Sequence, residues 1–245
     1  ALAVNMSKLY NINYVPGIEI GAEYKGRRVR VLGYFIDYKN DIFTTIENNG
    51  LVNERNASLE RVRRFEKILG VQIPVERLLH TNRFQRISGR LLVRHVLNSS
   101  LYDECEVLKP YRKMEMNKAV EILCQEYFAY GKPCYVMMKC PPLQDVLDVI
   151  SLTNGVAVLA DGADFLHDEE LMKDILSHGI EGIEVFQSAY NKKQMADLLR
   201  YAQKDKLLIT CGSGFTSRKQ GNELGDCHCP EEAESLIISL IRAKM

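Results

Sequence analysis

The sequence lacks several features that would point to a particular partner. Lysine plus arginine equals aspartate plus glutamate, at 32 residues each, so no net charge draws the chain to nucleic acid or to an anionic membrane. A local basic patch is still compatible with this balance. No apolar run is long enough to cross a bilayer, and no P-loop, Ser-His-Asp set, internal repeat or low-complexity tract is apparent. The sequence therefore predicts neither a membrane nor a nucleic acid as partner, and it leaves a protein partner open.

The chain also lacks the cysteine pattern of a disulfide framework. Its cysteines are odd in number and scattered, which favours reduced thiols and a cytoplasmic location. Cys227, His228 and Cys229 lie close together, but a zinc site needs a second ligand pair, so we interpret them as a loop thiol cluster. No signal peptide opens the sequence, and its start at Ala1 leads us to expect a fragment of a longer chain. The seven cysteines are Cys105, Cys124, Cys134, Cys140, Cys211, Cys227 and Cys229.

At 245 residues the chain can bury a full core, and its periodicity indicates an α/β fold. After residue 142, helical and strand patterns alternate at intervals of roughly 25 residues, which is typical of parallel α/β units. The helical stretches are 143–155, 168–179, 191–203 and 230–245, and the strand stretches are 156–160, 180–186 and 206–212. We expect a barrel or a doubly wound sheet built from residues 1–45 and 143–245.

The first part of the chain predicts strands and then a helical block. Residues 12–15, 18–24 and 26–36 read as strands of a meander. From about residue 53 the apolar spacing becomes helical, with Asn56 or Ser58 expected to cap the helix. Residues 46–142 therefore form a mostly helical insertion with no strand of its own in this interpretation.

Acidic residues follow several of the expected strands. Asp161 ends one strand, Glu184 lies within another, and Glu19 follows a Pro-Gly pair. Carboxylates that converge on the carboxyl edge of a parallel sheet are the ligands that a hard divalent cation prefers. The alternative is structural, with Glu184 paired to a neighbour and Asp161 capping a loop.

Five stretches, taken in order, resemble the PHP (polymerase and histidinol phosphatase) family of metal-dependent phosphoesterases. They are "YVPGIEIGAEYKGRRVRVLGYFID", "SGRLL", "AVLADG", "GIEGIEVFQSAYN" and "LLITCGSGF". The branch that the chain resembles most removes phosphates from nucleotides or degrades short RNA. The resemblance implies a distorted (β/α)7 TIM-like barrel with a helical insertion, whose first strand is missing from this sequence. It also implies two or three Mn, Zn or Fe ions that polarise a phosphate and supply a hydroxide nucleophile.

Most ligand positions implied by the resemblance carry other residue types. Glu19 matches the metal-binding glutamate of the family, but the expected histidines and the expected aspartate are replaced. Arginine would bring a positive charge to the place of a cation, while leucine and glycine side chains offer no lone pair. We therefore expect a degraded metal centre and no cofactor. The replacing residues are Arg30, Leu92, Asp161, Gly214 and Thr216.

Several interpretations of these positions stay open. Glu19 and Asp161 could hold one Mg-like ion, or Arg30 could form an ion pair with Glu19. Arg30, Arg90 and the backbone around Ser213 could instead bind the phosphate of a small ligand or nucleotide. The predicted function is a phosphate- or nucleotide-binding or regulatory scaffold. The alternative is an active phosphoesterase, a nucleotide phosphatase or exoribonuclease, with a reduced or relocated set of Mn, Zn, Fe or Mg ions.

Overall fold

The computed structural model describes residues 2–81, 84–215, 223–233, 235 and 237. The chain divides into two compact units. One, the sheet unit, consists of Ala1–Ile42 and Cys140–Met245, and the other, the helical unit, consists of Phe43–Lys139. Within the described residues, no helix has both the length and the apolar character needed to span a membrane.

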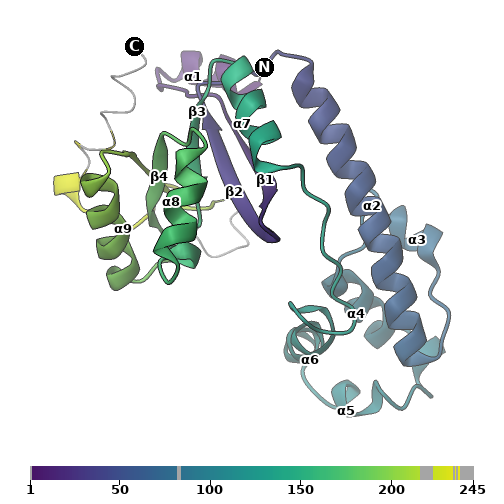
Figure 1. Ribbon diagram of the computed structural model, residues 1–245. Helices are drawn as coiled ribbons and strands as arrows, with labels where there is room; N and C mark the ends of the chain where they lie inside the picture. The colour runs from purple at the N-terminus through teal and green to yellow at the C-terminus, as the bar shows by residue number, and fades with distance from the viewer. Residues whose placement is uncertain (1, 82–83, 216–222, 234, 236, 238–245) are drawn as a thin grey trace. The chain divides into compact units, whose positions relative to one another are not determined.

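The sheet unit contains a five-stranded mixed sheet whose strands lie side by side in chain order (Figure 1). The first three strands pair antiparallel, and the last three pair parallel. β3 is buried along its whole length, as expected for an apolar strand that pairs with a neighbour on each side. The strands are β1 (Gly17–Tyr24), β2 (Arg27–Tyr34), β3 (Val156–Ala160), β4 (Gly182–Gln187) and β5 (Leu208–Gly212).

The described strands form an open sheet, so the closed (β/α)7 barrel expected from the resemblance is not shown. Within the described residues, β1 and β5 are the two outer strands of the sheet, and each pairs with one neighbour only. The strand expected at residues 12–15 was wrong. Helix α1 (Leu2–Leu9) ends with Asn11 in a left-handed conformation, and the Ile12 amide donates back to the Ser7 carbonyl at 2.8 Å. This pattern of hydrogen bonds ends the helix in a turn, so the chain at Asn11 and Ile12 does not start a strand.

Three helices of the sheet unit cover one face of the sheet (Figure 1). They are α7 (Leu143–Leu152), α8 (Glu169–Ser177) and α9 (Lys192–Lys204). Asp168 caps α8 by accepting from the Leu171 amide, and α9 begins with a reciprocal capping box. The predicted alternation of helices and strands after residue 142 is confirmed through β5. The helix expected at residues 230–245 falls largely outside the described residues.

The helical unit contains helices and turns only, within residues 43–81 and 84–139. Its core is formed by apolar side chains from α2, α4 and α6, with Phe65 and Leu92 fully buried. A short 3-10 helix, η1 (Ser100–Tyr102), follows α4. The α-helices are α2 (Ile42–Leu69), α3 (Val75–Leu79), α4 (Gly89–Asn98), α5 (Lys109–Arg112) and α6 (Met116–Leu123).

The predicted cap of the long helix at Asn56 or Ser58 was wrong, because α2 begins at Ile42. The Ile42 amide donates to the Asn40 side chain at 3.0 Å. Ser58 lies in the middle of the helix and is fully buried. Its hydroxyl donates to the Glu54 carbonyl and accepts from the Ile87 amide, both at 2.8 Å. Ser58 thus links α2 to the backbone at Ile87. A local sequence pattern does not distinguish this role of a serine from helix capping.

Candidate functional site

The registers of β1, β2 and β3 bring three charged side chains together at the carboxyl end of β3. We call this place the edge of the sheet. Arg30 on β2 lies opposite Gly21 of β1 and opposite Ala160 of β3. Glu19 is two residues from Gly21 on the same face of β1, and Asp161 directly follows Ala160. Arg30 therefore lies between two carboxylates that are far from each other in the sequence.

Arg30 forms ion pairs with both carboxylates. Its Nη1 atom is 3.2 Å from Glu19 Oε1, and its Nε donates to Asp161 Oδ2. The hydrogen bond and charge of Asp161, together with Glu19, raise the pKa of the Arg30 guanidinium against the opposing effect of burial. The Arg30 side chain is 35% exposed, so the pairs are partly screened by solvent. The ion pair between Arg30 and Glu19, one of the open interpretations, is present.

Asp161 adopts a left-handed backbone conformation with φ of 51°. Aspartate tolerates this conformation better than most residues. The Asp161 carbonyl accepts from the Asp164 amide at 2.9 Å, which closes a turn after β3. Its side chain makes no capping bond to the following 3-10 helix. Asp161 therefore caps the turn after β3 through its backbone, as the structural alternative held, while its carboxylate binds Arg30.

Glu184 is a buried carboxyl group on β4, with 6% of its surface exposed. Burial, followed by the negative charge of Asp161, raises its pKa to about 7. Gln187 Nε2 donates to Glu184 Oε2 at 2.9 Å, so Glu184 has a neighbouring partner, as the structural alternative held. A Cβ atom on Gly212 of β5 would lie 2.6 Å from Glu184 Oε1. Glycine at position 212 leaves the space that this carboxyl group fills.

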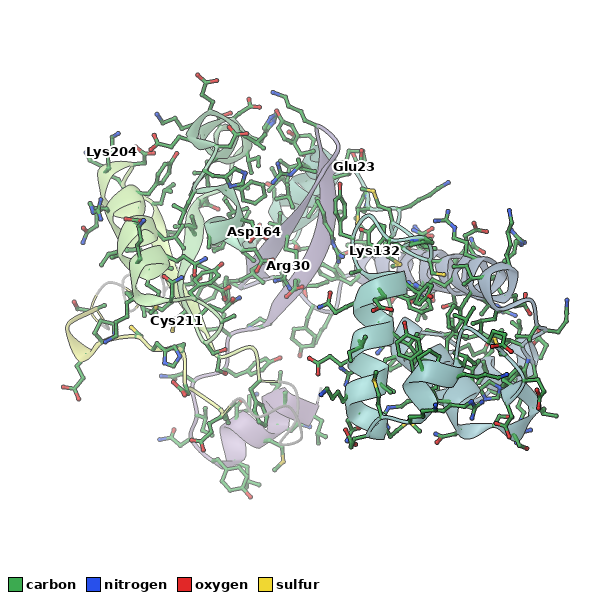
Figure 2. All side chains as sticks on the ribbon, turned by 90° about the horizontal axis from the view of Figure 1, so that it is seen from below. Glu23, Arg30, Lys132, Asp164, Lys204 and Cys211 are labelled. Atoms are coloured by element: carbon green, nitrogen blue, oxygen red, sulfur yellow. The ribbon has the colours of Figure 1, made fainter. Side chains whose placement is uncertain are left out.

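A small pocket opens beside the ion pairs, with a volume of about 230 Å³. Arg30 and Asp164 lie together at this edge of the sheet (Figure 2). The pocket lining combines two arginines with two aspartates and one aromatic ring, so its charges are mixed. The lining residues are Arg28, Arg30, Asp161, Asp164 and Phe165.

The remaining predicted site residues lie in different places. Ser213 follows β5, and its carbonyl accepts from the Ser188 hydroxyl at 2.9 Å. Arg90 is exposed in the first turn of α4, in the helical unit, so its grouping with Arg30 and Ser213 stays a prediction. Leu92 is fully buried in the core of the helical unit. Thr216 lies outside the described residues.

The residues at this edge do not fit a cluster of two or three metal ions. The two carboxylates that the sequence suggested as ligands, Glu19 and Asp161, are both bound by the Arg30 guanidinium. In the part of the chain that the structure describes, no three His, Cys, Asp or Glu side chains are grouped so that they could hold a metal ion. A cation at this point would meet a fixed positive charge and few free donors.

The thiol cluster includes a third cysteine that the sequence pattern did not identify. Cys211 at the end of β5 lines a pocket of about 440 Å³ together with Cys227, His228 and Cys229. Burial, and then the neighbouring Cys227 thiol, raises the pKa of Cys211 to about 12. His228 Nδ1 is 3.2 Å from Asp226 Oδ1. A buried thiol with such a high pKa is mostly protonated at neutral pH, so Cys211 is a weak nucleophile.

Comparison with known proteins links this geometry to phosphoesterases. The chain is 25% identical over 215 residues to a phosphoribosyl 1,2-cyclic phosphate 1,2-diphosphodiesterase of Eggerthella lenta, covering 87% of this chain and 76% of the relative. A crystal structure of a protein from Bifidobacterium adolescentis, assigned as a metal-dependent phosphoesterase, matches with a TM-score of 0.63. That match has 20% sequence identity and covers 97% of this chain and 80% of the other. The fold is a PHP-like phosphoesterase fold.

A second solved structure matches this chain with a TM-score of 0.67. It is an amidohydrolase from Chromobacterium violaceum with bound sulfate and no metal. The identity is 19%, and the match covers 96% of this chain and 81% of the other. No family model matches the chain. These likenesses establish the PHP-like fold and relatedness to metal-dependent phosphoesterases, while the chemistry of this chain must be argued from its own residues.

Proposed function

We propose that this chain is a divergent PHP-type protein in which a guanidinium stands in place of the metal centre. In this proposal it acts as a binding or regulatory scaffold for a small phosphorylated ligand or nucleotide. The observation that supports it most is the simultaneous pairing of Arg30 with Glu19 and Asp161. A guanidinium neutralises carboxylates, but unlike a metal ion it cannot bind a water molecule and lower its pKa to produce hydroxide.

Electrostatics favour Arg30 over a divalent ion at this position. At an effective dielectric constant of about 20, a divalent ion about 4 Å from the guanidinium would be repelled by roughly 8 kcal/mol. That repulsion cancels the attraction of one carboxylate at the same distance. Of Glu19 and Asp161, the equivalent of one carboxylate is then left to hold the ion. These two residues are therefore remnants of a metal site in this proposal.

Phosphate contacts in the proposed scaffold come mainly from donors other than Arg30, because Arg30 is already neutralised. Arg28 lines the same pocket and is exposed. The backbone after β5 offers further donors around Ser213, where Gly214 has a φ of 62°.

The architecture proposed for the whole chain follows the same family. Residues 1–45 and 143–245 would form a distorted (β/α)7 TIM-like barrel of the PHP type, of which the five-stranded sheet is the described part. Residues 46–142 would be its helical insertion. A cytoplasmic location also stays part of the proposal, and it is supported by the scattered free cysteines.

A second candidate is an active metal-dependent phosphoesterase with a reduced or relocated set of Mn, Zn, Fe or Mg ions. The activity in the name of the Eggerthella lenta relative favours it. Glu184 also favours it, because a carboxyl group with a pKa of about 7 can exchange protons near neutral pH. In this candidate, the Glu19 side chain would be one of the ligands.

Calorimetric titration of the full chain with AMP and with pyrophosphate separates the two candidates. The scaffold should bind without releasing phosphate, and Arg28→Gln should weaken binding at the sheet edge roughly tenfold through loss of a charge-assisted contact. Arg63→Gln is the matched control, because Arg63 is an exposed arginine paired with Glu60 in the helical unit. Mn-stimulated phosphate release that Glu19→Ala abolishes would reject the scaffold in favour of the enzyme.

A further inference from the structure

A second candidate site lies in the helical unit, in a groove of about 570 Å³ between α3, α4 and η1. We propose that this groove binds the phosphate groups of a small anionic ligand, independently of the edge of the sheet around Arg30. Its polar lining consists of guanidinium, imidazole, hydroxyl and amide groups. These belong to Arg77, Thr81, Arg94, His95, Asn98 and Ser99.

The charge of the groove is one-sided. Arg77 and Arg94 line it, and no aspartate or glutamate does. Arg94 Nη2 donates to the neutral Asn117 Oδ1 at 2.8 Å, and its charge lies near Glu115, whose pKa is lowered by backbone hydrogen bonds and then by Arg94. Among the described residues, Arg77 is exposed and has no hydrogen-bond or ion-pair partner. Two guanidinium groups in one groove, neither of them in an ion pair among the described residues, suit the recognition of a phosphate group.

The core of the helical unit fixes the face that α4 presents to the groove. Arg94, His95 and Asn98 follow helical spacing on one side of α4. Apolar residues on the other side, among them Val93 and Val96, are fully buried. Packing of the opposite face of α4 thus orients the polar side chains toward the groove before a ligand binds.

Arg112 covers the carbonyl groups at the carboxyl end of α4. Arg112 Nη1 donates to the Leu97 carbonyl at 3.0 Å, and its Nη2 donates to the Val96 and Ser99 carbonyls at 2.9 and 3.1 Å. Arg112 also forms an ion pair with Asp103 at 2.9 Å, so its charge offsets the partial negative charge of this helix end only in part.

His95 lies half-buried in the groove and responds to its charge. Burial, and then the charge of Arg77, lowers the pKa of His95. The other ionisable side chain beside it is Tyr102 of η1, whose hydroxyl is 3.4 Å from His95 Nε2. The pKa of Tyr102 is raised by burial and then by Glu66 of α2. A bound phosphate would offset the repulsion from Arg77, so it should raise the pKa of His95.

The size of the groove suits a small ligand. Pockets for small molecules usually measure about 300–1,000 Å³, and this one lies within that range. Pyrophosphate is an appropriate probe, because it carries phosphate groups without a base or sugar that could bind elsewhere. The ligand class is therefore a phosphate monoester or a pyrophosphate compound.

NMR titration of the full chain with pyrophosphate tests the proposal, because the imidazole resonances of His95 report on this groove alone. We expect saturation to raise the pKa of His95 measurably, and Arg77→Gln or Arg94→Gln to weaken the response of His95 roughly tenfold. Arg28→Gln at the edge of the sheet and Arg63→Gln, outside the groove, should leave it unchanged. Matched melting temperatures would show that the exposed Arg77 variant is folded.

Two outcomes would overturn the groove proposal. One is a pKa of His95 that does not move in saturating pyrophosphate, and the other is an unaltered His95 response in both arginine variants. Because Arg28→Gln affects only the sheet edge, failure of the groove and failure of the proposed scaffold site are distinguishable.

Discussion

At the scale of single residues, the central feature is the exchange of metal-ligating side chains for a guanidinium. Arg30 satisfies Glu19 and Asp161 together, which avoids leaving two carboxylates unpaired beside the buried Glu184. Removing one partner of such a cluster would leave uncompensated charge, which costs more than an exposed ion pair contributes. The cluster can therefore stabilise the sheet edge without any catalytic role.

Glu184 gives the sheet unit a specific dependence on pH. Its pKa is raised from 4.5 to about 7, so its contribution to stability is fully present below about pH 4.5 and is lost as the pH rises through 7. Glu184→Gln removes this loss, because a neutral amide of the same shape needs no proton. We expect the variant to match the wild type near pH 4.5 and to exceed its free energy of unfolding at pH 8 by on the order of 3 kcal/mol.

Urea unfolding of both proteins between pH 4.5 and pH 8 measures this difference. Glu181→Gln is the control, since Glu181 is exposed and lies just before the same strand. A difference between wild type and Glu184→Gln that stays constant with pH would contradict the burial of an ionisable carboxyl group at position 184.

At the scale of elements, β4 and β5 are fitted to each other through Gly212. A methyl group at this position would lie 2.6 Å from Glu184 Oε1. Gly212→Ala should therefore lower the free energy of unfolding by about 1–3 kcal/mol, the usual cost of overpacking. Adding Glu184→Ala should recover part of the loss attributed to Gly212→Ala in a double-mutant cycle. Strictly additive effects would show that the two positions are not in contact.

Two helical glycines of the helical unit offer an opposite pair of predictions. Gly50 lies within α2 with no atom within 4 Å of an added Cβ, whereas a Cβ on Gly89 of α4 would lie 2.6 Å from Phe128. Gly50→Ala should raise the free energy of unfolding by about 0.5–1 kcal/mol, because alanine favours the helix. Gly89→Ala should lower the free energy of unfolding, because the added methyl group would overlap the Phe128 ring. Thermal unfolding followed by circular dichroism measures both variants. A destabilising Gly50→Ala would contradict the helix assigned there.

The sequence predicted elements well where local rules decide them. The helices and strands from α7 to β5 were predictable because apolar periodicity and capping residues such as Asn191 act over a few residues. The start of α2 was not predictable, because Ser58 uses its hydroxyl inside the helix rather than at its end. Closure of a barrel could not be derived either, since it depends on pairing between strands that are distant in the sequence.

The candidate site was predictable only in part. The pairing of Arg30 with Glu19 was a stated alternative, because an arginine at a former cation position can pair with the remaining carboxylate. The pairing with Asp161 spans 131 residues and depends on the register of β2 and β3, which no local pattern encodes. Arg77 and His95 likewise lie on separate helices, without a motif that would have joined them in one groove.

At the scale of the whole molecule, a net charge of zero is compatible with two local regions of different charge. The edge of the sheet holds acidic groups around one guanidinium, whereas the groove of the helical unit is lined by arginines without acids. The formal net charge of +0 therefore does not argue against anion binding.

The most direct test of the account is the metal content of the protein purified from cells grown with added Mn, Zn and Fe. Inductively coupled plasma mass spectrometry should find these metals only far below one ion per chain, and equally in wild type and Glu19→Ala, because Arg30 occupies the carboxylates. One or more ions per wild-type chain, lost in Glu19→Ala, would contradict the replacement of the metal centre by a guanidinium.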